Sequence, residues 1–99
     1  MIDLDSLSGF DWDEGNARKN EKHGVSMAEA EQVFFNQPLL LLEDGAHSQS
    51  EPRFHALGKT DTGRTLHITF TLRQFGALVR VISARDMHRK ERAIYENAT

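Results

Sequence analysis

The 99-residue sequence contains no cysteine. It therefore excludes disulfides, thiolate catalysis and cysteine-ligated zinc or iron–sulfur sites. It also lacks any apolar run near the roughly 18 residues that a membrane-spanning helix needs. The acidic start of the chain, MIDLDSLSGFDWDE, has no basic segment of the kind that opens a secretory signal. We therefore expect a cytoplasmic protein with no membrane span.

Basic residues are scarce in the first half of the chain. Residues 1–51 hold 3 basic and 11 acidic residues, whereas residues 52–99 hold 9 basic and 4 acidic residues, within a formal net charge of -3. Such a split favours a charged partner, and the basic half keeps nucleic acid among the candidates. The alternative is that the two halves neutralise each other through surface ion pairs.

Local signals divide the chain into seven elements. A first helix begins after Asp13 and ends at His23, followed by Gly24 in the left-handed conformation. A second begins at Ser26, which forms an S-x-x-E capping box with Glu29. Apolar and alternating runs then predict strands over 39–43, 53–59, 65–73 and 77–85, and a last helix capped by Asp86. The order predicts an α+β fold, with a small four-stranded antiparallel sheet, two N-terminal helices and a C-terminal helix. We expect a flexible leader over 1–9 and a single domain over 10–99.

Strand 65–73 shows the clearest alternation. One face carries Leu66, Ile68, Phe70 and Leu72, against which we expect all the helices to pack. The opposite face, with Thr65, His67, Thr69, Thr71 and Arg73, would then stay at least partly open to a ligand.

This open face predicts a phosphate site. Pairing across the turn at 60–64 places Arg53 and His55 near Thr71 and Thr69, and the last strand adds Ser83 with Arg85, or Arg80. Arginine forks and hydroxyls suit phosphate oxygens, and His67 or His55 can move a proton near neutral pH. The alternative is an ordinary solvated sheet face. No histidine pair has metal-ligand spacing, so we expect no metal. Glu43 and Asp44 adjoin at a strand end, where an edge role is expected.

Four segments carry a resemblance to a known family: WDEGNARKNEKHGVS, EPR at 51–53, TLR at 71–73 and RVISARDMHRKERAIYE at 80–96. The chain resembles BrnT, the ribonuclease toxin of BrnT/BrnA type II toxin–antitoxin systems, from about Phe10 to Tyr95. The resemblance implies a RelE-like fold, metal-independent RNA cleavage and translation arrest. It also implies a partner, a BrnA-like ribbon-helix-helix antitoxin whose dimer binds operator DNA.

The resemblance also implies site residues. Its motif positions here are Arg53, Arg73, Ser83 and Arg85 as catalytic groups, with Lys22, His23, Glu91 and Tyr95 as RNA contacts. His67 is added on its chemistry alone, as a candidate for proton transfer, and Arg80 as a further RNA contact on the basic strand. The competing hypothesis is a non-catalytic module that binds nucleic acid or protein in transcriptional regulation.

Overall fold

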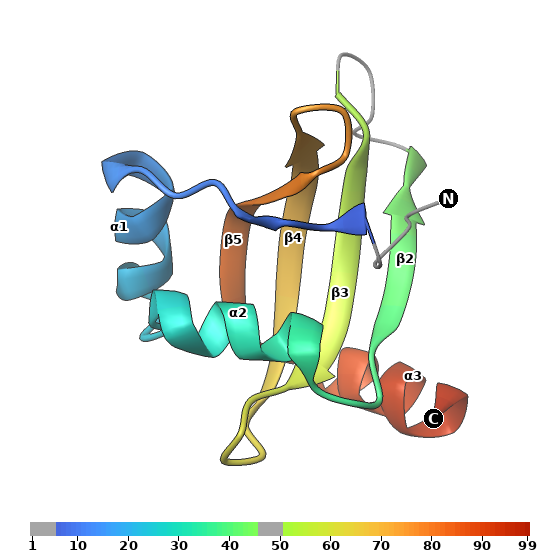
Figure 1. Cartoon of the computed structure of the whole chain (residues 1–99). Helices are drawn as coiled ribbons and strands as arrows, with labels where there is room; N and C mark the ends of the chain where they lie inside the picture. Colours follow the sequence, from blue (N-terminus) through green and yellow to red (C-terminus); the bar gives the residue numbers. More distant parts are fainter. Residues whose placement is uncertain (1–5, 46–50) are drawn as a thin grey trace.

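The structure is a computed structural model that describes residues 6–45 and 51–99. A single sheet, in the order β1-β5-β4-β3-β2, carries three helices (Figure 1). Its elements, in chain order, are β1 (Gly9–Phe10), α1 (Glu14–Lys22), α2 (Met27–Phe35), β2 (Leu40–Asp44), β3 (Arg53–Lys59), β4 (Thr65–Arg73), β5 (Leu78–Asp86) and α3 (Arg89–Ala98). None of these helices is long and apolar enough to cross a membrane.

The α+β class is confirmed, but the expectation of four antiparallel strands is wrong. The sheet is mixed and five-stranded, because β1 pairs in parallel with β5 and places Gly9 opposite Leu78. Bonds from the Ser8 nitrogen to the Ala77 oxygen (2.7 Å) and from the Asp11 nitrogen to the Val79 oxygen (2.8 Å) extend this pairing. Two residues are too few to show an alternating pattern in the sequence. β1 is a strand only because its backbone pairs with β5, far along the chain.

Residues 6–9 of the expected leader belong to the described part of the chain. Leu7 packs against the core, and Ser8 and Gly9 join β5. Residues 1–5 of that leader lie outside the described residues.

The first two helices begin as their capping residues predict. The Asp13 carboxylate accepts from the Asn16 nitrogen at 3.0 Å, and the Asn16 side chain accepts in return from the Asp13 nitrogen at 2.7 Å. The Ser26–Glu29 box caps the N-terminus of α2 in the same way, with both bonds at 3.1 Å. Reciprocal bonds of this kind satisfy main-chain donors that a helix start leaves without a partner. Gly24 follows α1 with φ 71°, as predicted.

The predicted cap of the last helix is wrong. Asp86 ends β5, and its carboxylate binds Arg64 at 2.7 Å. The helix begins at Arg89 instead, after His88, whose main-chain nitrogen donates to the Glu91 carboxylate at 2.8 Å. Asp86 has a side chain suited to capping, but Arg64, the residue before β4, binds it instead.

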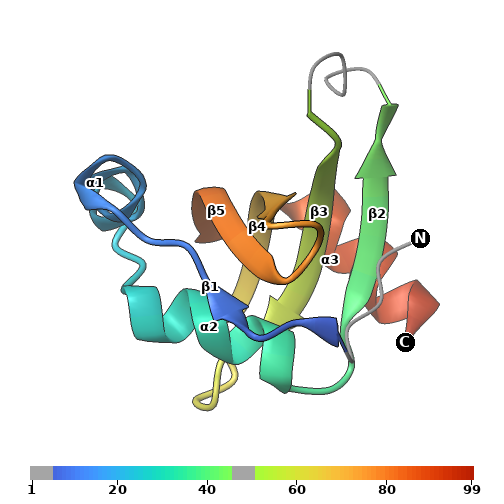
Figure 2. The ribbon, with the colours of Figure 1, turned by 45° about the horizontal axis from the view of Figure 1, so that its top comes forward.

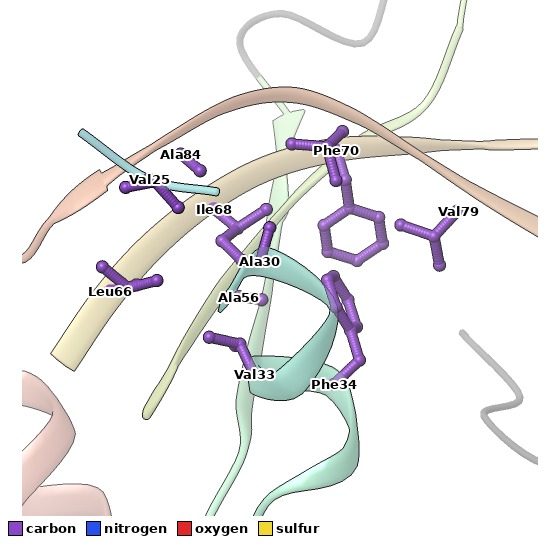
Figure 3. Packing of buried hydrophobic residues seen from close by; sticks show 11 residues of the cluster. Val25, Ala30, Val33, Phe34, Ala56, Leu66, Ile68, Phe70, Val79 and Ala84 are labelled. Carbon is purple, nitrogen blue, oxygen red and sulfur yellow. The ribbon is translucent and has the colours of Figure 1, made fainter. Parts of the chain in front are cut away.

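The main core lies between α2 and one face of the sheet. Figure 3 shows Ala30, Val33 and Phe34 of α2 facing Ile68 and Phe70 of β4. The Phe34 and Phe70 rings meet edge to face, with centroids 5.0 Å apart. Fully burying side chains of this size contributes about 1.5–3 kcal/mol each, so this layer fixes the sheet on the helix.

Gly58 allows α2 to approach the sheet closely. A Cβ atom at this position would lie 2.8 Å from the Val33 side chain. That distance is shorter than a carbon–carbon contact, so the packing of α2 on β3 requires a glycine.

The expectation that every helix packs on the same face is wrong. Met87 and Tyr95 pack with Leu57 and Leu40, which point to the face opposite Ile68 and Phe70, and this cluster holds α3 there. The Tyr95 hydroxyl donates to the Pro38 oxygen at 2.6 Å. Figure 2 shows α3 behind β2 and β3, with α2 on the near side. The C-terminal helix therefore covers one end of the sheet face that was expected to be open.

Candidate functional site

The polar face of the sheet is formed by alternate residues of β4 and their neighbours on β3 and β5. Register places His67 opposite Arg85, and Thr69 between His55 and Ser83. A β-bulge next to Thr69 keeps Ser83 and Arg85 in this alignment. The sequence-predicted neighbours His55 and Thr69 are thus confirmed as a cross-strand pair.

His55 lies at the centre of a hydrogen-bonded chain. Its Nε2 atom is 3.0 Å from an Asp44 oxygen, and its Nδ1 atom is 3.0 Å from the Thr69 hydroxyl. A carboxylate accepts but does not donate, so Nε2 carries a proton toward Asp44. In the neutral ring, Nδ1 then accepts from the Thr69 hydroxyl. These two hydrogen bonds fix both the tautomer and the orientation of the His55 ring.

His67 is packed beside this chain. Its ring centroid lies 4.9 Å from that of His55, and its side chain is 12% exposed. Nε2 is 3.6 Å from a Glu91 oxygen, which is beyond hydrogen-bond distance, and Nδ1 has no hydrogen-bond partner among the described residues. Burial lowers the pKa of His67 to about 4, helped by nearby Arg85 and opposed by Glu91. The ring is therefore neutral at pH 7.

Arg85 and Glu91 form a two-pronged ion pair above His67. The two guanidinium nitrogens of Arg85 donate to the two Glu91 oxygens at 2.7 and 2.9 Å. Burial raises the pKa of Glu91, but bonds from Arg85 and the His88 nitrogen outweigh it and lower the pKa to about 2. The hydrogen bond to Glu91 raises the pKa of Arg85. Both groups are therefore charged at neutral pH, and the Arg85 side chain is 28% exposed.

The other predicted catalytic residues extend away from this cluster. Ser83 is half-buried beside Thr69, and Arg53 lies across from Asp44 at the start of β3. Arg73 ends β4, opposite Leu78, and pairs with Glu51. Arg73 is six residues from His67, which corresponds to about 20 Å along a strand, so the structure does not bring Arg73 and Arg85 together.

The predicted RNA contacts lie in separate places. Glu91 belongs to the central cluster, whereas Arg80 binds Asp13 at 2.7 Å and Asp11 at 3.4 Å at the edge next to α1. Tyr95, on α3, is buried against Leu57 and Leu40 of the sheet. Lys22 and His23 are exposed at the C-terminal end of α1.

Sequence reasoning missed the part played by Asp44. Its neighbour Glu43 and the edge position of the strand suggested no chemistry, yet Asp44 holds His55. The signal was the spacing of β2, since Leu40, Leu42 and Asp44 alternate onto the polar face.

A hollow of about 490 Å³ lies on the other side of the molecule, where Leu7, Phe10 and Phe35 line it. Its wall is aromatic, and Glu31 contributes a carboxylate that accepts from Trp12 at 2.8 Å. It contains no cluster of proton-transfer groups among the described residues, so we assign the chemistry to the polar face.

A known protein family matches most of the chain. A family model matches residues 12–91, and its description is ribonuclease toxin, BrnT, of type II toxin–antitoxin system. The comparison with curated proteins gives no match. Within residues 6–45 and 51–99, no three histidine or acidic side chains are grouped as a metal ion requires.

Proposed function

Because this chain belongs to the BrnT family of ribonuclease toxins of type II toxin–antitoxin systems, we propose that it cleaves RNA on the polar face without a metal ion. One observation carries the proposal. His67 and Arg85 are cross-strand neighbours, and the carboxylate of Glu91 binds Arg85 at 2.7 Å and lies 3.6 Å from His67. Cleavage of a phosphodiester requires a base that accepts a proton and a cation that stabilises the charge on the phosphate. A neutral imidazole and a fixed guanidinium on one surface can serve as these two groups.

The 2′-hydroxyl of RNA is the nucleophile in this proposal. His67 takes the hydroxyl proton while the 2′ oxygen bonds to phosphorus, and the bond from phosphorus to the 5′ oxygen breaks. The 5′ oxygen leaves with a proton from solvent. Arg85 stabilises the charge that develops on the phosphate oxygens, and the Ser83 hydroxyl donates a hydrogen bond to one of these oxygens. The products carry a 2′,3′-cyclic phosphate and a 5′-hydroxyl.

Glu91 is a positioning residue in this scheme. A guanidinium has five N–H groups, and Glu91 takes one from each terminal nitrogen of Arg85. The second Nη1 hydrogen of Arg85 donates to the Asp86 main-chain oxygen at 3.1 Å. This leaves the Nε hydrogen and one Nη2 hydrogen for a phosphate, in a direction that the carboxylate fixes. Tyr95 lies one turn later on α3 and anchors that helix to the Pro38 oxygen, so it supports Glu91 from within the core.

The outer cations serve the rest of the RNA. Arg73 is too far from His67 to share its phosphate, so we assign Arg73 and Arg53 to neighbouring phosphates. Lys22, His23 and Arg80 line a second route at the α1 edge. Phosphate contacts of this kind position a strand without reading its sequence.

The partner is an antitoxin, as the family description implies. We assign it to the BrnA-like ribbon-helix-helix type, with a dimer that binds operator DNA. Free toxin would then act in the cytoplasm and arrest translation by cutting RNA. The acidic first half of the chain, with 3 basic and 11 acidic residues in 1–51, suits a basic segment of that antitoxin. A gel-shift assay with operator DNA tests this, since the toxin should shift DNA only when the antitoxin is present.

The decisive experiment incubates the purified chain, free of antitoxin, with end-labelled RNA in EDTA. We expect cleavage by the wild type, a fall of about 100- to 1,000-fold in Arg85→Lys, and a fall of about 100- to 10,000-fold in His67→Gln. Lys90→Ala, at an exposed position of α3, is the matched control and should cut normally. DNA of the same sequence should stay intact because it lacks the 2′-hydroxyl.

Three results would count against the proposal. Loss of wild-type cleavage in EDTA, restored by a divalent cation, would refute metal independence. Wild-type binding to RNA without cleavage would favour the non-catalytic module. Equal cleavage by wild type and both site variants would place the chemistry elsewhere.

A further inference from the structure

The turn between β4 and β5 has a backbone that its sequence does not favour. The Ala77 nitrogen donates to the Gln74 oxygen at 3.2 Å, which makes Phe75 and Gly76 the central residues of the turn. Both have positive φ, at 57° and 88°, and Gln74 before them has φ 51°. β-turns with positive φ at both central positions are dominated by Gly, Asn and Asp. A phenylalanine in the left-handed region is strained, because the Cβ atom of an L-residue then lies too close to the following carbonyl oxygen.

Phe75 gains nothing from packing in return. Its relative solvent exposure is 111%, against 75% for the exposed Phe35 on α2. Backbone strain at a position that adds nothing to the core points to a use outside the fold.

The turn adjoins the polar face. Arg73, the residue before Gln74, ends β4 on that face, and its side chain is 36% exposed. Figure 1 shows the β4–β5 turn at the end of the sheet opposite α3, so α3 leaves this end uncovered. Residues 73 and 75 have Cα atoms at most about 7 Å apart, which lets one nucleotide reach both side chains.

We propose that Phe75 is a stacking platform for an unpaired nucleobase of RNA whose phosphate binds Arg73. This rests on the proposed function, because it needs RNA on the polar face. Aromatic rings stack on every base, so the platform would hold a single strand without selecting its sequence. The left-handed turn already presents the ring to solvent before RNA arrives, so binding needs no rearrangement that would expose it.

The test measures affinity for a fluorescent single-stranded RNA with methylated 2′ oxygens, which 2′-hydroxyl attack cannot cleave. Phe75→Ala and Phe75→Leu should raise Kd about 5- to 150-fold, the range for removal of one stacked base. Phe75→Trp should bind at least as tightly as the wild type. Phe35→Ala is the matched control and should leave Kd unchanged. Urea unfolding should show that no Phe75 variant is less stable, because the ring packs on nothing in the core.

Each other outcome overturns the inference in a recognisable way. A leucine variant with wild-type Kd would show an apolar contact without stacking. Unchanged Kd in all three variants, while the wild type still cuts RNA, would refute the platform and leave the proposed function standing. Loss of antitoxin binding by Phe75→Ala, measured by calorimetry, with unchanged RNA affinity would assign the ring to a protein interface. A wild type that neither binds nor cuts RNA would end both proposals.

Discussion

Burial of His67 makes a quantitative prediction about stability in acid. The folded state holds its pKa at about 4, below the ordinary value of about 6.5. The unfolded chain therefore binds the proton more tightly. The stability that comes from the neutral ring is complete above about pH 6.5 and is lost as the pH falls toward 4. Between about pH 7.5 and about pH 4.5 this linkage amounts to about 2.5 kcal/mol of the free energy of unfolding.

Glu91 adds little over the same interval. Its folded pKa of about 2 also lies below its ordinary value of about 4.3. Its contribution is present above the ordinary value and is lost as the pH falls toward 2. Only about 0.3 kcal/mol of it disappears by about pH 4.5, so the effect of His67 dominates this window.

The assay is urea unfolding, followed by the fluorescence of Trp12, the single tryptophan. The wild type and His67→Gln are compared at the two pH values, so that any constant cost of the substitution cancels. We expect the wild type to lose about 2.5 kcal/mol more than the variant. His23→Gln is the control and should follow the wild type, because an exposed side chain changes its solvation little on folding. If His67→Gln lost stability in parallel with the wild type, the argument from burial would be refuted.

Three further predictions concern the elements that hold the site. Glu91→Gln should lower the free energy of unfolding by about 2 kcal/mol in urea at neutral pH, because Arg85 loses a charge-assisted partner; the exposed Glu96→Gln should change it little. Gly58→Ala should cost about 1–3 kcal/mol in thermal melting, because the new methyl would lie 2.8 Å from an α2 side chain. Tyr95→Phe should cost about 1 kcal/mol and speed amide hydrogen exchange in α3, since the 2.6 Å hydroxyl bond is lost; unchanged exchange would show that the bond does not hold the helix.

The elements predicted correctly are those with local signals. The alternation of Leu66, Ile68 and Phe70 defines β4 because a strand places every second residue on the same face. The Ser26 box and Gly24 mark the boundary between α1 and α2 because their side chain and backbone act within one turn. Each of these features is encoded within a few residues.

The sheet face that α3 covers can be predicted only by comparing residues on neighbouring strands. Leu57 stands between His55 and Lys59 on the polar face, and Leu40 lies across from it on β2. These two apolar residues on a polar face are the signal that something covers them. The alternation of β4 alone does not show it, because β4 contributes His67 at that level.

Asp44 illustrates why the candidate site was only partly predictable. The pair of His55 and Thr69 follows from a short hairpin whose turn fixes the register. The contact between Asp44 and His55 depends on how β2 aligns with β3 after a longer connection, and the sequence does not specify that alignment. Tight turns therefore transmit register to the site, whereas longer connections do not.

Ion pairs within the molecule neutralise part of the charge difference between the two halves of the chain. Under the proposed function, these pairs bear on which arginines can bind RNA. Arg64, Arg73 and Arg80 each bind a carboxylate from residues 1–51. Arg80 holds two of them, Asp11 and Asp13, and is 23% exposed, so a phosphate would have to displace both. Arg73 has its pair to Glu51 at a more open position, and exposed pairs contribute at most about 1 kcal/mol. Under the proposed function, a phosphate can therefore replace Glu51 at little cost, which favours Arg73 over Arg80 as the cation that first binds the RNA.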